Sequence, residues 1–243
     1  MKAYTILCGD SLHLLKGMSD NSFGVCCFSP PYGVGSYFDI CKDFSTCESK
    51  FLHYLKEITR VSDITAINFT QLFERDKRNS LFIEKMIISA ETLGIRLYDR
   101  WVIEKPSVKP RRGERALSGW EYVLLFLSPS VSEFNVIPRN NAYEYRTLLK
   151  CKGHSNYSKK DASFRYVGTT PYFPEIPRQV IEMYGRKKTL DPFCGTGTTL
   201  MESLKLGIPC VGIDIVPDIV KCAKRNCEKT VKNGRKVNIT SLM

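Results

Sequence analysis

Apolar positions along the chain follow two periodicities, one typical of strands and one typical of helices. Short apolar runs predict strands at Tyr4–Cys8, Phe23–Phe28, Ile64–Phe69, Leu97–Ile103, Tyr122–Leu127, Lys188–Leu190 and Cys210–Ile213. Between many of them lie helical patterns, at Ser11–Met18, Glu48–Val61, Ser80–Leu93, Pro177–Tyr184, Thr198–Leu206 and Pro217–Thr230. This alternation predicts an α/β domain whose mostly parallel sheet is covered by helices on both faces.

Two parts of the chain interrupt the alternation. No helix is predicted between Leu97–Ile103 and Tyr122–Leu127, so these two strands are expected to form an antiparallel pair. The segment between them, Lys105–Gly119, is a basic loop punctuated by Pro and Gly. A second segment, Ser128–Thr170, is polar and has weak periodicity.

One predicted strand ends in an unusual way. Phe23–Phe28 runs directly into Ser29-Pro30-Pro31-Tyr32. A proline lacks an N–H and has a fixed φ, so it fits neither a helix interior nor a central strand. The strand is therefore predicted to end in a stiff hook.

A glycine-rich loop lies near the other end of the chain. The sequence TLDPFCGTGTTL, at 189–200, reads as a short strand, a turn containing Gly195 and Gly197, and a helix start. Such a turn lets the backbone approach a ligand closely, although a plain strand–helix turn has the same pattern. The next strand ends in Asp214, where nucleoside-binding folds place an acidic side chain, and the first strand ends in Asp10. Both aspartates are also candidate helix N-caps. Carboxyl ends of parallel strands share one edge, so the loop and the hook are expected to meet there.

Charge indicates the kind of partner. The chain has 243 residues, which suits one α/β domain, a formal net charge of +11 and a pI of about 9.2. This excess of positive charge favours a polyanionic partner, with nucleic acid first.

Cysteine usage and hydropathy bear on the compartment. The ten cysteines contain no C-x-x-C pair and the three histidines are scattered, so no metal site is predicted. Several cysteines, among them Cys8, Cys26 and Cys210, lie in apolar runs, which predicts buried free thiols in a reducing compartment. No apolar run approaches the ~18 residues of a membrane span, and the first residues lack the features of a secretory signal. We expect a cytoplasmic protein with access to DNA and no membrane partner.

Together these motifs resemble the S-adenosylmethionine-dependent amino-methyltransferases, which act on exocyclic amino groups of DNA bases. The hook is similar to their catalytic [DNS]-P-P-[YFW] motif, and Asp191–Gly197 to their cofactor loop, D-P-F-x-G-[ST]-G-T. The stretches WVIEKP and LSGWEYVLLF resemble their W-x-K and S-x-E-Y patterns. The hook precedes the loop, as in the permuted β group. One departure is Thr169–Pro174, which lacks the histidine that members often carry there.

The resemblance implies a Rossmann-like methyltransferase fold with a seven-stranded, mostly parallel sheet that contains one antiparallel strand. It implies S-adenosyl-L-methionine as cofactor, with Asp214 at its ribose and Asp10 near its adenine. The implied cofactor-binding residues are Asp10, Asp191, Pro192, Phe193, Gly195, Gly197, Thr198 and Asp214. The implied catalytic residues are Ser29, Pro30, Pro31 and Tyr32. The chain then divides into a catalytic half at 1–127, a small target-recognition segment at 128–170 and a cofactor-binding half at 171–243.

For the reaction, the resemblance favours transfer of a methyl group to N4 of cytosine in double-stranded DNA after base flipping, because S-P-P-Y goes more often with cytosine and D-P-P-Y with adenine. The basic loop suits DNA phosphates, through Lys105, Lys109, Arg111, Arg112 and Arg115. A cognate restriction endonuclease acting separately is a possible partner.

Several alternatives share these motifs. Adenine N6, RNA and protein glutamine are other targets of related hooks, and the positive charge favours nucleic acid among them. A non-catalytic DNA-binding relative would keep the fold, although the intact Asp191–Gly197 loop argues against it. A nicotinamide oxidoreductase would leave the Pro-Pro-Tyr hook unexplained.

Overall fold

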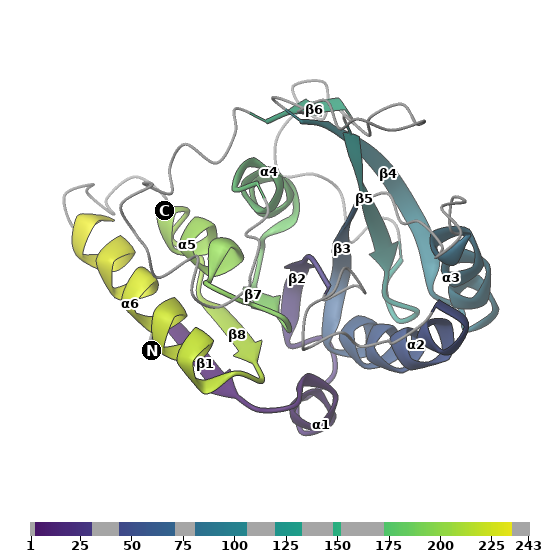
Figure 1. The fold of residues 1–243 in the computed structure, drawn as a ribbon, viewed down its shortest axis with the longest axis horizontal. Helices are drawn as coiled ribbons and strands as arrows, with labels where there is room; N and C mark the ends of the chain where they lie inside the picture. The colour runs from purple at the N-terminus through teal and green to yellow at the C-terminus, as the bar shows by residue number, and fades with distance from the viewer. Residues whose placement is uncertain are drawn as a thin grey trace, which may run out of the picture.

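A single sheet organises the molecule (Figure 1). The computed structural model describes residues 3–30, 44–70, 81–105, 120–132, 148–151 and 173–234. Its eight strands lie in the order β1-β8-β7-β2-β3-β5-β4-β6. They are β1 (Tyr4–Cys8), β2 (Phe23–Phe28), β3 (Ser62–Thr70), β4 (Arg96–Glu104), β5 (Trp120–Leu127), β6 (Leu148–Lys150), β7 (Lys188–Asp191) and β8 (Cys210–Asp214).

The strand directions confirm a mostly parallel sheet with one antiparallel strand. β5 pairs antiparallel with both β3 and β4, and the other pairs of neighbouring strands are parallel. The sheet has one strand more than the seven expected, because β6 adds to the free edge of β4. β6 has three residues and belongs to the polar segment 128–170, where the sequence shows no strand periodicity.

Helices cover both faces of the sheet, as the alternating pattern predicts (Figure 1). They are α1 (Ser11–Lys16), α2 (Phe44–Val61), α3 (Phe82–Thr92), α4 (Glu175–Tyr184), α5 (Thr198–Lys205) and α6 (Pro217–Gly234). The first three pack on one face, where Leu15, Leu55 and Met86 join the apolar side chains of β2 and β3. On the other face, α4 buries Val180 against β2 and β3, and α5 and α6 pack against β1, β7 and β8.

The centre of the sheet joins distant parts of the sequence. β2 and β7 are parallel neighbours, with Cys26 level with Leu190. From this pair the chain proceeds outward in opposite directions, through α2 to β3 and through α5 to β8. In open α/β sheets, ligands bind beyond the carboxyl ends of the strands at such a reversal of strand order.

The cysteines are mostly, but not all, buried. Of the eight whose side chains the structure describes, seven are buried and Cys8 is exposed, and all eight are free thiols. The expectation of burial is therefore wrong for Cys8, because β1 is an edge strand with only β8 beside it. Within the described ranges, no group of three or more potential metal ligands occurs, and no helix is long and apolar enough to cross a membrane.

Candidate functional site

Four neighbouring strands end at one edge of the sheet, and each carries part of the predicted site. In sheet order, β1 leads to Asp10, β8 ends in Asp214, β7 opens the 191–197 loop and β2 leads to Ser29. The register places Cys8 level with Asp214, and the backbone N–H of Gly9 donates to the Asp214 carbonyl oxygen at 3.0 Å. Residues from both ends of the chain thus meet along a single edge.

Asp214 holds two backbone segments together. Its Oδ2 accepts a hydrogen bond from the N–H of Gly195 at 3.0 Å, and its Oδ1 accepts one from the N–H of Val216 at 2.9 Å. The first bond fixes the glycine loop, and the second fixes the turn into α6. Burial raises the pKa of this carboxyl. Asp214 therefore orders the glycine loop and the turn before α6, but its bond to Val216 lies before the first helical residue, Pro217, and is not the N-cap bond of the capping alternative.

The loop itself has the backbone that its glycines predict. Gly195 has a φ of 51° and Gly197 a φ of 92°, in the left-handed region that favours glycine. Helix α5 starts directly after Gly197, and its Thr199 hydroxyl donates to the Cys27 carbonyl oxygen of β2 at 3.0 Å. This bond ties the start of α5 to the strand that carries the hook.

Asp191 is a buried carboxyl beneath the loop. Its Oδ1 accepts a hydrogen bond from the N–H of Phe193 at 3.0 Å, and its side chain is 1% exposed. Burial raises its pKa to about 7, while its interaction with the Thr199 side chain and the hydrogen bond from the Phe193 N–H lower the pKa. In the described structure, Asp191 stabilises the loop by accepting the Phe193 N–H.

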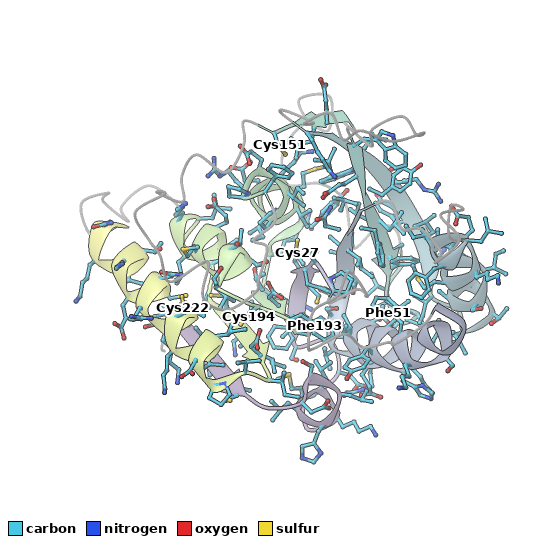
Figure 2. All side chains as sticks on the ribbon, viewed as in Figure 1. Cys27, Phe51, Cys151, Phe193, Cys194 and Cys222 are labelled. Carbon is cyan, nitrogen blue, oxygen red and sulfur yellow. The ribbon has the colours of Figure 1, made fainter. Side chains whose placement is uncertain are left out.

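Two side chains that carry no sequence motif, Tyr54 and Ser11, join Asp10 and its helix α1 to the loop. Asp10 caps α1 by accepting from the N–H of His13 at 2.8 Å, and its other oxygen accepts from the Tyr54 hydroxyl at 3.3 Å. The Tyr54 ring lies 5.4 Å from that of Phe193, which in turn lies 5.3 Å from Phe28 (Phe193 is labelled in Figure 2). The Ser11 hydroxyl donates to the Pro192 carbonyl oxygen. Tyr54 is an ordinary amphipathic position of α2, and only the fold brings it to Asp10.

The hook begins where β2 ends. Ser29 is partly exposed and Pro30 is buried. Both follow Phe28, which is fully buried at the end of the strand. Pro31 and Tyr32 lie outside the described residues. The structure thus brings the first half of the hook beside the strand that opens the glycine loop.

The predicted phosphate contacts fall in two groups. Lys109, Arg111, Arg112 and Arg115 lie outside the described residues. Lys105 forms an ion pair with Glu121 of β5 at 2.9 Å, and only 21% of its side chain is exposed. An ammonium engaged by a carboxylate is poorly available to a phosphate. In the structure without DNA, Lys105 is thus engaged by Glu121, and its contact with a DNA phosphate stays a prediction.

The fold is shared with solved methyltransferase structures. PvuII DNA methyltransferase, described as cytosine-N4-specific, superposes with a TM-score of 0.75 at 18% identity over 96% of this chain and 94% of its own. A Thermus thermophilus protein, provisionally assigned as a DNA modification methylase and solved with S-adenosyl-L-methionine, gives 0.69 at 19% identity over 93% and 95%. The complex of M1.HpyAVI with SAM gives 0.66 at 16% identity over 92% and 99%.

No curated protein sequence matches the chain significantly. A family model, in contrast, spans most of it. The model is that of the N6/N4 DNA methylases, and it matches residues 24–225, which include the hook, the glycine loop and Asp214. The chain therefore belongs to the DNA methylase family.

Proposed function

We propose that this protein transfers a methyl group from S-adenosyl-L-methionine to the exocyclic N4 of cytosine in double-stranded DNA. The observation that carries the proposal is the adjacency of β2 and β7, because it sets Ser29 and Pro30 beside the 191–197 loop. Membership of the DNA methylase family supports the methyl transfer and the DNA substrate. The choice of cytosine rests on Ser29 at the head of the hook and is supported by the similarity to PvuII methyltransferase.

The residues at the edge fit this cofactor. Each Asp214 oxygen accepts one backbone N–H, which leaves lone pairs for the ribose hydroxyls. Gly195 and Gly197 allow the backbone to approach the ligand closely. Asp10 is exposed and can accept from a donor beside it, such as the adenine amino group. The cofactor, when bound, supplies an electrophilic methyl group.

The hook activates the target nitrogen. The amino nitrogen of a base is a poor nucleophile, because its lone pair is delocalised into the ring. In our proposal Ser29 Oγ and the Pro30 carbonyl oxygen each accept a hydrogen bond from one of its two N–H groups. These bonds favour a pyramidal nitrogen whose lone pair is aimed at the methyl group. Acceptors held by proline backbone need no reorganisation during the reaction, which is where electrostatic catalysis is strongest.

The target base has to leave the duplex to reach these acceptors. Tyr32 is proposed to stack on the flipped base, and Lys109, Arg111, Arg112 and Arg115 to contact DNA phosphates. Residues 128–170 are proposed to read the recognition sequence, between the catalytic half at 1–127 and the cofactor-binding half at 171–243. Their strand β6 extends the sheet on the β3–β5–β4 side of the hook. A restriction endonuclease acting separately is the proposed biological partner.

The test is a product analysis. Duplex DNA is incubated with the protein and methyl-labelled S-adenosyl-L-methionine and digested to nucleosides, and the labelled nucleoside is identified. We expect N4-methylcytosine. Label in N6-methyladenine would replace cytosine by adenine as the target, and label only in RNA or protein would refute DNA as the substrate.

The Ser29→Ala variant tests the role of the hook. We expect methyl transfer to fall by roughly 10²-fold, the loss typical of one preorganised hydrogen-bonding group, while binding of S-adenosyl-L-methionine measured by calorimetry is unchanged. An equal loss of cofactor binding would assign Ser29 a structural role.

A further inference from the structure

A buried amide next to the hook has one atom without a partner. Asn68 lies on β3 and is 1% exposed. Its Nδ2 donates to Glu121 Oε2 at 3.0 Å and to the Tyr122 carbonyl oxygen at 3.1 Å. Its Oδ1 has no hydrogen-bond partner in the part of the chain that the structure describes. A buried acceptor that is left unpaired destabilises the fold, so Asn68 Oδ1 is a candidate for a hydrogen bond that forms only when substrate is bound.

The orientation of this amide is fixed by its neighbours. Both partners of Nδ2 belong to β5, and Glu121 is itself held by Lys105 at 2.9 Å. A flipped amide would turn its oxygen toward two acceptors. Since the nitrogen faces β5, the oxygen on the other arm of the amide faces away from β5. β2 is the strand on that other side of β3.

Asn68 lies level with Ser29. The β2–β3 register pairs Phe28 with Ile67, so Ser29 and Asn68 are the next residues on two parallel strands. Such strands are about 4.8 Å apart. Ile67 and Phe28 point into the apolar core under α1, α2 and α3, so alternation turns Asn68 to the opposite face. The same alternation, continued for one residue beyond β2, puts Ser29 on that face as well.

A serine hydroxyl needs a second residue to orient its hydrogen. A hydroxyl carries one hydrogen, and it accepts a bond from the target amino group only when that hydrogen points elsewhere. We propose that Asn68 is a positioning residue, whose Oδ1 accepts the Ser29 hydroxyl hydrogen when the base is bound. The Oγ lone pairs then face the amino group. Glu121 and Lys105 hold the amide in the orientation that this requires. The inference rests on the proposed function, since it assigns a partner to the hydroxyl of the hook.

A double-mutant cycle tests the inference. Single-turnover methyl transfer into duplex DNA, at saturating cofactor and fixed salt, is compared for wild type, Ser29→Ala, Asn68→Ala and the double variant. We expect Asn68→Ala alone to slow transfer about tenfold, the order of one hydrogen bond, with cofactor affinity unchanged. In the Ser29→Ala background, the same change is expected to slow transfer less than twofold, because no hydroxyl remains to be oriented.

Equal effects of Asn68→Ala in the two backgrounds would overturn the inference, since Asn68 would then act on the base or on the fold directly. A Ser29→Asp background is a second check. A carboxylate has no hydrogen to place, so Asn68→Ala is again expected to have little effect. Inactivity of the wild type on DNA would refute the proposed function, whereas activity with independent effects would refute only this inference.

Because Asn68→Ala changes a buried residue and could disturb the fold, a variant at Lys105, which is partly exposed, provides a further test. Lys105→Met removes the charge that holds Glu121, and we expect a several-fold slower transfer that is again absent in the Ser29→Ala background. Lys187→Met is its matched control, because Lys187 also pairs with a carboxylate, Asp63, at 2.9 Å. That pair lies at the starts of β3 and β7, at the opposite edge of the sheet, so transfer is expected to be unchanged. Equal losses in both lysine variants would overturn the role of the Lys105–Glu121 pair.

Discussion

At the scale of single residues, Asp191 stands out because it is a fully buried carboxyl at the start of the loop that, in our proposal, presents its backbone to the cofactor. Burial raises its pKa to about 7. Between pH 3.8 and about pH 7, Asp191 is protonated in the folded protein. In the unfolded chain its pKa has the ordinary value of 3.8, so there it is ionised over the same range. The folded state is thus favoured by protons in this window, and the free energy of unfolding falls as the pH rises from about 4 to about 7.

Asp191→Asn removes this titration. We expect the free energy of unfolding of the variant, measured by urea denaturation, to lose the decline between pH 4 and 7 that Asp191 contributes. The difference between wild type and variant is expected to change across the window by on the order of 4 kcal/mol, the value of a shift of about three pH units. Parallel pH curves for the two proteins would show that Asp191 does not titrate in this range.

Asp214 leads to a prediction about affinity. Its carboxylate oxygens hold the Gly195 and Val216 N–H groups and, in our proposal, the ribose hydroxyls. Asp214→Asn removes the charge and half of the acceptors, and charge-assisted bonds are worth about 1.5–3 kcal/mol. We expect cofactor affinity, measured by calorimetry, to fall roughly 10- to 100-fold. Asp218→Asn, in the exposed first turn of α6, is the control, with affinity expected to be unchanged.

At the scale of elements, the contact between α5 and β8 positions the glycine loop. Gly212 on β8 faces this contact, and a Cβ built on it would lie 2.6 Å from Leu200 Cδ1 and 3.0 Å from Cys194 Sγ. The first distance is shorter than real Cβ contacts, so the Leu200 side chain, α5 or the loop would have to move. The close packing of α5 against β8 therefore requires a residue without a side chain at position 212.

We expect Gly212→Ala to lower the free energy of unfolding by about 1–3 kcal/mol, the usual cost of overpacking, and to weaken cofactor binding through the displaced loop. Thermal unfolding and calorimetry measure the two effects. Gly17→Ala is the matched control: its φ is −84° and its Cβ would meet nothing closer than the Leu14 carbonyl oxygen at 3.6 Å. Equal stability of the two variants would show that a methyl group at position 212 fits between β8 and α5, contrary to the distances in the structure.

Elements were easier to predict from the sequence than the contacts between them. The strand Phe23–Phe28 has the same bounds in the structure, because a buried run flanked by a polar turn and prolines is a local signal. β6 was not predicted, since three residues in a polar segment carry no periodicity. The contacts of Tyr54 and Asn68 are not predictable from the sequence either, because each is made to a residue that is distant along the chain and that only the fold brings near. The exposure of Cys8 likewise follows from strand order, which the sequence of that strand does not encode.

At the scale of the whole molecule, charge governs the encounter with DNA. With a net charge of +11, affinity for duplex DNA is expected to fall steeply with salt. Each phosphate contact contributes about 0.9 to the slope of log K against log salt. Arg111→Ala combined with Arg112→Ala is therefore expected to flatten the slope by about 2, measured by fluorescence anisotropy on duplex DNA. Lys232→Ala, in the last turn of α6, should leave it unchanged. A slope that the arginine pair does not alter would place the phosphate contacts elsewhere.

The pairing of β2 with β7 also sets the order in which the protein can be completed during synthesis. β2 leaves the ribosome well before β7, one of its two neighbouring strands, which begins at Lys188, and β1 is likewise made well before its single partner, β8. At about 5–20 residues per second, a buried apolar strand remains half-paired for roughly ten seconds or longer. The nascent chain therefore holds an unpaired strand edge that attracts chaperones and other nascent chains. It also lacks a finished site until β7 and β8 have been made.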